Sequence, residues 1–232
     1  MGRFDLQIIL QLLWIGPERG KLEMKFALIV CSALALAVPA QAEDQFGWTG
    51  PYIGVETGFN ALNFDAHYTD NTFKGSGGTA TPSFGGQAGY NFQNGKIVYG
   101  FEVDANFMGY NQIDVTAKDT YAAQSDWYGT ARGRIGVANG RGLVYATGGL
   151  ALSKVDIQDS LFISSNTLSP SMELGWVAGA GIEYAVNDKI SLKGEFLHLD
   201  YGTLQSTDFF NGAPVQTHYQ DNVVRLGLNF HF

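Results

Sequence analysis

The sequence is short of cysteine, of charge and of long apolar runs, and each shortage excludes a class of protein. Its one cysteine, Cys31, lies in a segment that we expect to be removed, which leaves no thiol for catalysis or metal binding. The charged fraction of 16% is low for a soluble surface. A mean hydropathy of −0.03 is too polar for a bundle of membrane helices.

Clustered basic residues are lacking as well. Phosphate binding needs grouped Lys and Arg, whereas this chain has a net charge of −8, so we expect no nucleic-acid partner. What the sequence has instead is glycine, 30 residues, together with 13% aromatics. This composition favours an all-β fold, because glycine is depleted from helices and aromatics are enriched in strands.

The segment 24–42 has the three parts of a secretory signal peptide. A charged start precedes an apolar run over 26–38, and an A-x-A site ends at Ala42. The run is shorter than the roughly 20 residues of a spanning helix, so we expect cleavage between Ala42 and Glu43. Residues 1–23 would then be an upstream extension from a misassigned start, and an uncleaved N-terminal anchor is the alternative.

From Trp48 onward, apolar and polar residues alternate with a period of two, as in strands with one apolar face. Each run approaches the length of about 9 to 11 residues that a tilted strand needs to cross a bilayer. The phase is least clear at Gly148-Gly149, where we favour Val144, Leu150 and Leu152 facing outward. We predict eight strands, over residues 51–60, 84–92, 97–107, 126–137, 143–152, 172–186, 189–201 and 219–232.

The connections between these strands alternate in length. Asn94-Gly95 in the first short connection is a strong hairpin signal. The alternation predicts an all-β, eight-stranded antiparallel up-and-down transmembrane β-barrel over 43–232, with short periplasmic turns and four longer external loops. The short connections lie at 93–96, 138–142 and 187–188, and the long ones around 61–82, 108–125, 153–171 and 202–218.

The apolar face is predicted to meet lipid, because its aromatic residues gather at the strand ends. Two aromatic girdles of this kind anchor barrels at the two membrane interfaces. The expected girdles comprise Phe59, Phe107, Trp127 and Trp176 near the long connections, and Tyr90, Phe92, Tyr99 and Tyr184 near the short turns.

The polar face carries charged residues from six strands, five acids and four bases. Arg132 and Arg134 would each cost roughly 2 to 4 kcal/mol at a lipid-facing midplane position, so this face must line the lumen. Near-balanced charge predicts mutual pairing. Because eight strands leave room only for side chains, we expect a packed plug, with a selective pore as the alternative. The predicted network comprises Glu56, Glu102, Asp104, Arg132, Arg134, Glu183, Lys193, Glu195 and Arg225.

Five motifs, in their order along 48–232, resemble the small outer-membrane β-barrel family of alphaproteobacteria. The resemblance implies a barrel similar to the membrane domain of the OmpA group, of porin-family or surface-antigen type. It also implies an abundant surface protein that supports the integrity of a Gram-negative outer membrane. One departure, Glu195-Phe196-Leu197-His198 where the family often has a second Tyr, affects only local packing. The motifs are Trp48-Thr49-Gly50-Pro51-Tyr52-Ile53-Gly54, Gly86-Gln87-Ala88-Gly89-Tyr90-Asn91, Arg132-Gly133-Arg134-Ile135-Gly136, Tyr145-Ala146-Thr147-Gly148-Gly149 and Val224-Arg225-Leu226-Gly227-Leu228-Asn229-Phe230.

No catalytic residue, metal or cofactor is expected. Lipid-modifying barrels need a nucleophile beside an oriented histidine, and no histidine here has a serine two residues away. Distant serines such as Ser125 or Ser153 are the remaining possibility. The spacing of the histidines matches no metal signature. The four are His67, His198, His218 and His231.

The first and last long connections combine aromatics with histidine. Such a set could bind haem or a host surface through stacking and an imidazole ligand. We expect ordinary external loops instead, with partners that the sequence leaves open. The residues concerned are Phe64, His67, Tyr68 and Phe73 in the first, and Phe209, Phe210, His218 and Tyr219 around the last.

The last strand ends on Phe232, with Phe230 two residues earlier. A terminal Phe on an alternating strand resembles the signal read by the barrel-assembly machinery. The same strand is predicted to close the sheet against 51–60 and so remove its edges. The expected partners are this machinery and periplasmic chaperones during export, and then outer-membrane lipid and lipopolysaccharide.

Overall fold

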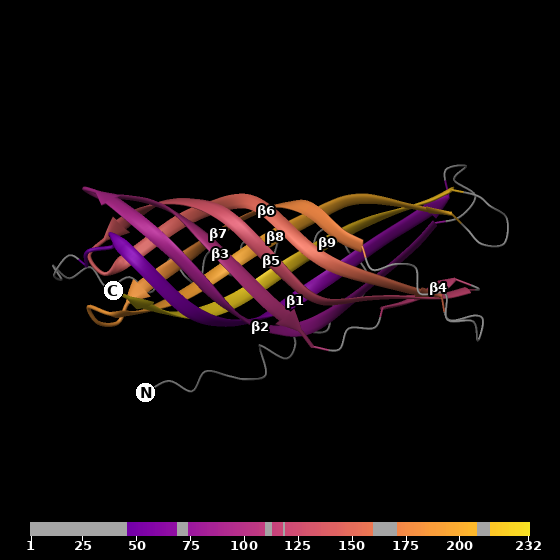
Figure 1. The fold of residues 1–232 in the computed structure, drawn as a ribbon, viewed down its shortest axis with the longest axis horizontal. Helices are drawn as coiled ribbons and strands as arrows, with labels where there is room; N and C mark the ends of the chain where they lie inside the picture. The colour runs from indigo at the N-terminus through magenta and orange to yellow at the C-terminus, as the bar shows by residue number, and fades with distance from the viewer. Residues whose placement is uncertain (1–45, 69–73, 110–112, 118, 160–170, 208–213) are drawn as a thin grey trace, which may run out of the picture. The chain divides into compact units, whose positions relative to one another are not determined.

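The computed structural model describes residues 46–68, 74–109, 113–117, 119–159, 171–207 and 214–232. Nine antiparallel strands form one sheet, and eight of them close into a barrel because β3 pairs with β5 while β1 pairs with β9 (Figure 1). The short β4 pairs with β5 alone. No helix in the described ranges is long and apolar enough to cross a membrane. The strands are β1 Gly50–Tyr68, β2 Lys74–Asn94, β3 Ile97–Met108, β4 Ile113–Ala117, β5 Asp119–Asn139, β6 Gly142–Asp159, β7 Ser171–Ala185, β8 Ile190–Thr207 and β9 Pro214–His231.

The strands are tilted, as their diagonal course in Figure 1 shows. A path that starts at Gly175 of β7 and passes from each residue to its pairing partner on the next strand returns to β7 at Ala185. The end of this path lies ten residues from its start. With eight strands this stagger corresponds to a tilt of about 40°, as in transmembrane barrels. Side chains at one height on neighbouring strands are therefore not direct pairing partners, but lie one or two residues apart in register.

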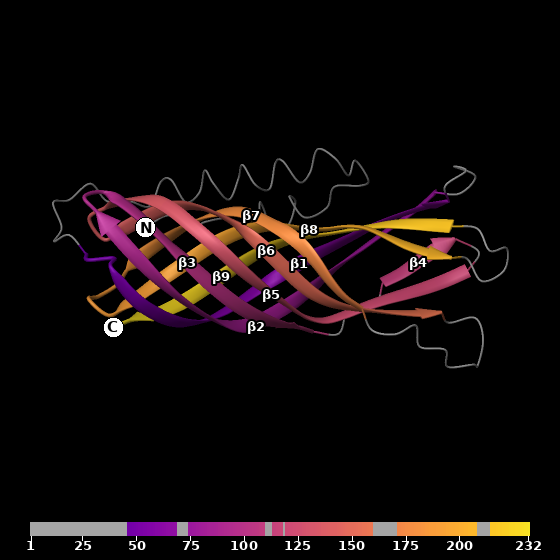
Figure 2. The same cartoon turned by 45° about the horizontal axis from the view of Figure 1, so that its top comes forward.

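The strands run further than the alternation predicted. The described parts of the stretches expected as long loops are largely β-ladder: β1 pairs with β2 as far as His67 and with β9 as far as Tyr68. Figure 2 shows these ribbons projecting past the barrel. Where water borders both faces, a strand needs no apolar face, so hydrophobic alternation ends before the backbone pairing does. We call this end of the barrel the extended end, and the other the short-turn end.

Gly95 and Lys96 form the turn between β2 and β3, and Gly95 has a positive φ of 59°. The turn therefore lies one residue later than the Asn94-Gly95 pair that signalled it, since Asn94 still pairs with Ile97. Gly202, with a φ of 76°, occupies a bulge in β8. The hairpin between β2 and β3 was predicted from the sequence, and the bulge at Gly202 was not.

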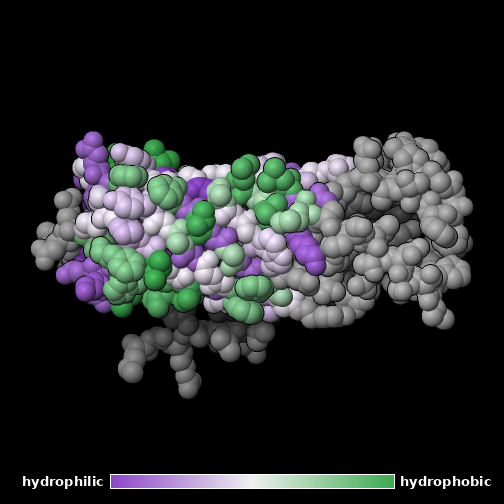
Figure 3. All heavy atoms as spheres, viewed as in Figure 1, coloured by the Kyte–Doolittle hydropathy of each residue, from purple (hydrophilic) through white to green (hydrophobic). Residues whose placement is uncertain are grey.

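The two faces of the sheet differ as alternation requires. Apolar side chains on the outer wall are exposed, and they gather on the barrel surface in Figure 3. The ambiguous phase of β6 is resolved in favour of Val144 and Leu150 facing outward, because both are exposed while Leu143 and Tyr145 are buried. The interior is therefore the polar side of the sheet, the reverse of a soluble barrel.

Candidate functional site

The nine charged residues predicted for the lumen all lie inside the barrel, and none is more than 7% exposed. Their alternate positions on six strands turn them inward, and glycines on the same face leave room for the long ones. A Cβ added at Gly227 would lie 3.2 Å from Cε of Lys193, and one added at Gly58 would lie 2.8 Å from Cβ of Arg225. The inward glycines are thus part of how long cations fit an eight-stranded lumen.

Glu102 of β3 is the centre of the network, because all four bases lie against it. It pairs with Arg132, and its oxygens lie 3.1 Å from Nζ of Lys193 and 3.6 Å from both Arg134 and Arg225. No pair can change without leaving another group uncompensated. Because these side chains are buried, their charges stay favourable only while they remain paired.

Arg225 of β9 joins the network across the barrel. It reaches Glu56 and Glu195 at 2.6 Å each, and Asp104 at 3.3 Å. Arg132 contacts Asp104 at 2.9 Å and Glu195 at 3.1 Å. Strands β1, β3, β5, β8 and β9 are therefore tied together through the lumen as well as through their backbones.

Arg134 has a different environment from the other cations. Its guanidinium lies 5.0 Å from the ring centroid of Tyr52 and 4.8 Å from that of Tyr145, and it pairs with Glu183 at 2.9 Å. Both tyrosines also donate hydrogen bonds to the network: Tyr52 to Glu102 and Tyr145 to Glu195, each at 2.8 Å. Cation–π contacts of this desolvated kind are worth about 2 kcal/mol.

Sequence reasoning missed these tyrosines, together with a shell of neutral polar groups and one acid. The amide of Asn106 donates to Glu56 at 2.8 Å, and that of Asn229 to Glu183 at 2.7 Å. Asp221 is buried and accepts from Asn60 at 2.6 Å, and no Lys or Arg in the described part of the chain pairs with it. Their inward parity on the strands was the signal that could have found them.

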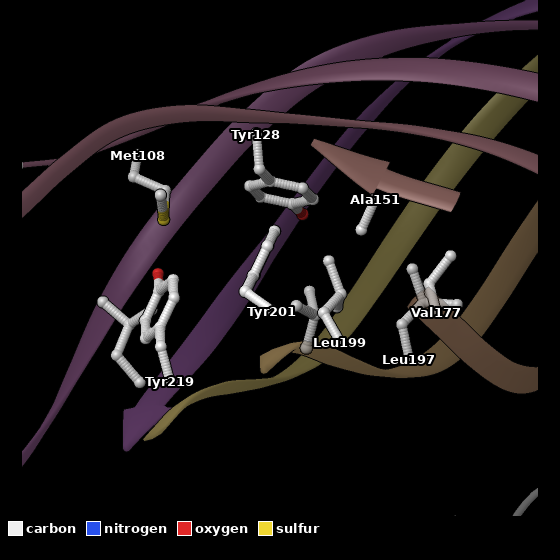
Figure 4. Close-up of a cluster of buried hydrophobic side chains, with 10 residues drawn as sticks. Met108, Tyr128, Ala151, Val177, Leu197, Leu199, Tyr201 and Tyr219 are labelled. Atoms are coloured by element: carbon white, nitrogen blue, oxygen red, sulfur yellow. The ribbon is translucent and has the colours of Figure 1, made fainter. Parts of the chain in front are cut away.

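Apolar layers close the lumen on both sides of the charges. The extended-end layer packs tyrosines and aliphatics toward one another (Figure 4), with Tyr201 and Tyr219 stacked at 4.9 Å. The short-turn layer closes the other side. The extended-end layer comprises Leu62, Met108, Tyr128, Ala151, Val177, Leu197, Leu199, Tyr201, Tyr219 and Val223, and the short-turn layer Phe46, Trp48, Val98, Ala138, Leu143, Tyr145 and Ala185.

The short-turn layer depends on a segment that precedes the first strand. Trp48 is fully buried, and its backbone N–H donates to Gln93 at 2.8 Å. Phe46 packs edge-on against Trp48 at 4.8 Å, and both rings meet His231 at the end of β9. This segment therefore closes the lumen at the short-turn end, and it contacts both β2, through Gln93, and β9, through His231.

Ser191, His231 and Glu183 lie together beneath this segment. Ser191 Oγ lies 2.9 Å from Nε2 of His231 and 2.5 Å from Glu183. Glu183 faces that same Nε2 at 3.5 Å, whereas a catalytic triad needs the acid on the other ring nitrogen. All three are buried, so the group has neither the orientation nor the access of a hydrolase site.

The predicted girdle residues lie on the outer wall. Trp127 and Tyr90 are half-buried, and the other six are exposed. At the short-turn end, Phe92 and Tyr99 stack at 5.5 Å. Phe230 and Phe232 also face outward, and Phe232 is 73% exposed. The cleavage positions Ala42 and Glu43 lie outside the described residues.

The aromatic and histidine set expected in two loops is differently arranged. Phe64, His67 and Tyr68 belong to β1, and His218 and Tyr219 to β9, whereas Phe73, Phe209 and Phe210 lie outside the described residues. Tyr219 is buried in the extended-end layer while His218 faces outward. Neighbours on opposite faces of one strand cannot both contact one planar ligand.

A tilted, closed eight-stranded barrel with an apolar wall and a polar interior defines a transmembrane barrel of the outer-membrane type. The chain belongs to the outer membrane protein beta-barrel domain family, whose profile matches residues 28–232. It is 35% identical to the 31 kDa outer-membrane immunogenic protein of Brucella melitensis, over 84% of this chain and 88% of that protein. It is 31% identical to the 22 kDa outer membrane protein of Rhizobium leguminosarum, over 84% and 83%.

The fold also matches a solved structure. The outer membrane protein OprG of Pseudomonas aeruginosa aligns with a TM-score of 0.56 at 13% identity, over 82% of this chain and all of that one. That likeness concerns the fold alone. The protein is thus an outer-membrane β-barrel protein, which confirms the predicted fold, family and location. In outer-membrane barrels the short turns face the periplasm and the longer connections face the cell exterior.

Proposed function

We propose that the protein is a structural and surface component of the outer membrane whose lumen does not conduct. One observation carries the proposal: the paired charges lie between two apolar layers, so a hydrated ion would have to displace packed side chains three times in succession. Ions cross barrels through continuous water, and the two apolar layers with the paired charges between them oppose such a path. The narrow porin is the competing function.

Conductance in planar bilayers tests this proposal directly. Purified barrel, inserted from detergent and shown to be folded by its heat-modifiable migration, is expected to give no steady openings above the lipid leak. Liposome swelling with small sugars and amino acids provides a second measurement on the same preparation. Steady unitary openings, or swelling faster than in protein-free liposomes, would establish the porin and refute the sealed lumen.

We also propose that the protein is not an enzyme and has no haem site. The burial and geometry of Ser191, His231 and Glu183 support the first statement, and the opposite faces of His218 and Tyr219 support the second. Hydrolysis of labelled lipid by folded protein, or a change in the haem spectrum on titration, would contradict them.

The proposed partners follow from the outer wall. Exposed apolar side chains and girdles suit outer-membrane lipid and lipopolysaccharide, whereas the outward Phe230 and Phe232 are available to the barrel-assembly machinery before the barrel closes. Periplasmic chaperones would cover the same apolar faces during export. Crosslinking from position 232 in cells should therefore capture the assembly machinery during biogenesis and lipid afterwards.

A further inference from the structure

On β8 and β9, the outward side chains near the extended end change from apolar to polar between one outward position and the next. Val224 pairs with both Phe59 and Phe196, which makes an apolar row. One row further out, Asn222 is paired with His198 instead. On β1, β2 and β3 near this level, one outward side chain of each strand is an exposed aromatic: Phe59, Phe84 and Phe107. The external girdle therefore has a polar gap over β8 and β9.

Three side chains from three strands fill this gap as one group. Nδ1 of His198 lies 2.9 Å from Oδ1 of Asn222. The imidazole also meets the indole of Trp176, with ring centroids 5.4 Å apart and planes inclined at 55°. Trp176 is exposed, and the other two are half-buried. We call Trp176, His198 and Asn222 the outer-interface patch.

More polar groups continue the patch away from the lipid. Nε2 of His218 lies 2.7 Å from the amide nitrogen of Gln220 and 3.6 Å from Oδ2 of Asp200. The other carboxylate oxygen of Asp200 accepts from the backbone of Gly202 at 2.7 Å. Within the described parts of β7, β8 and β9, no Lys or Arg lies on the outward face. The surface is thus rich in hydrogen-bonding groups but has no permanent cation.

The occupant follows from the position and chemistry of this patch. The outward face of a barrel at its external girdle is covered by the headgroups of the outer leaflet. A phosphate would meet Asp200 with no Lys or Arg to compensate it. A sugar suits the site, because amide and imidazole groups exchange hydrogen bonds with hydroxyls and an exposed indole packs on the apolar side of a ring.

We propose that the outer-interface patch binds the sugar headgroup of an outer-leaflet glycolipid. The proposal rests on the proposed contact with outer-membrane lipid, and it is independent of whether the lumen conducts. The bound headgroup would hold the barrel at a fixed height and rotation relative to the outer leaflet.

The test uses Trp176 as its own reporter. The protein carrying Trp14→Phe and Trp127→Phe, which leaves Trp48 and Trp176 as its tryptophans, is reconstituted in phosphatidylcholine bilayers containing increasing fractions of digalactosyl diacylglycerol. Trp48 is buried in the lumen and should contribute a constant background. We expect the Trp176 emission to change and to saturate with glycolipid. His198→Ala combined with Asn222→Ala should raise the half-saturating fraction by about tenfold, as two lost hydrogen bonds would.

Matched controls keep this outcome specific. Phe107→Ala removes an aromatic from the same girdle outside the patch and should leave the half-saturating glycolipid fraction unchanged. His198→Gln keeps a hydrogen-bonding side chain and should hold this fraction close to that of the unsubstituted patch. Heat-modifiable migration verifies folding of each variant. The sugar site would be overturned if the Trp176 emission did not saturate with glycolipid, if the double variant responded equally, or if only phosphatidic acid gave a response. Conductance in planar bilayers would instead overturn only the sealed lumen.

Discussion

The middle of the lumen is built mainly from paired charges and its two ends mainly from apolar side chains, with Asn60 and Asp221 buried beside the extended-end layer. The middle holds nine charges paired with one another, while the ends are apolar layers. The two ends also differ from each other. Side chains of the strands close the extended end, whereas Phe46 and Trp48, which precede the first strand, help to close the short-turn end. The charges therefore depend on the layers, because apolar side chains keep water away from them, and the barrel depends on the charges remaining paired.

The largest effect is expected from breaking the charged middle. Arg225→Met leaves Glu56 and Glu195 buried without their closest cation, which should cost about 3–5 kcal/mol of unfolding free energy. Urea unfolding in detergent micelles measures it. Arg141→Met, which breaks a partly exposed pair with Asp188, is the control and should change stability by less than about 1 kcal/mol. Equal effects of the two would mean that the network contributes nothing special.

Removing Trp48, which closes the short-turn end of the lumen, should lower the unfolding free energy somewhat less. Trp48→Ala deletes a fully buried indole and should lower the unfolding free energy by about 3 kcal/mol. Because the charged middle and the extended-end layer remain, planar-bilayer conductance should stay at the leak level. Steady openings in this variant would show that the end, not the middle, excludes ions.

Two adjacent glycines test how tightly the inside of the barrel is packed compared with its outside. A Cβ at Gly149, which faces inward, would lie 2.1 Å from the backbone oxygen of Ala131, whereas one at Gly148 would lie 3.5 Å from its nearest neighbour, the backbone oxygen of Val177. Gly149→Ala should therefore destabilise the barrel by about 1–3 kcal/mol. Gly148→Ala should remain within about 0.5 kcal/mol in the same urea titration, and a reversed order would contradict the assigned faces.

The smallest change in stability is expected at the C-terminus, outside both regions. Deleting Phe232 removes one exposed ring and should change the unfolding free energy by no more than about 1 kcal/mol. It should nevertheless reduce assembled barrel in the outer membrane more than Phe59→Ala, which removes a ring of similar exposure. Equal amounts of heat-modifiable barrel from both variants would leave Phe232 with a structural role alone.

The period of two along the chain was sufficient to predict eight strands and the side of the sheet on which charge lies. It failed where both faces of a strand meet water, so the outer parts of β1, β2, β5, β6, β8 and β9 were interpreted as loops. It also did not predict that Phe46 and Trp48 close the short-turn end, because both residues precede the first strand and alternation gives no contacts across the lumen.

Composition and alternation by themselves determined a transmembrane barrel, its inward charges and its outward apolar wall, because burial in lipid acts on every second residue. Which charges meet one another follows from the closed and tilted barrel. Glu102 contacts cations from β5, β8 and β9, and those neighbours follow from the stagger of ten residues around the closed barrel. Strand closure and tilt set contacts across the lumen, and no local pattern in the sequence encodes such distances.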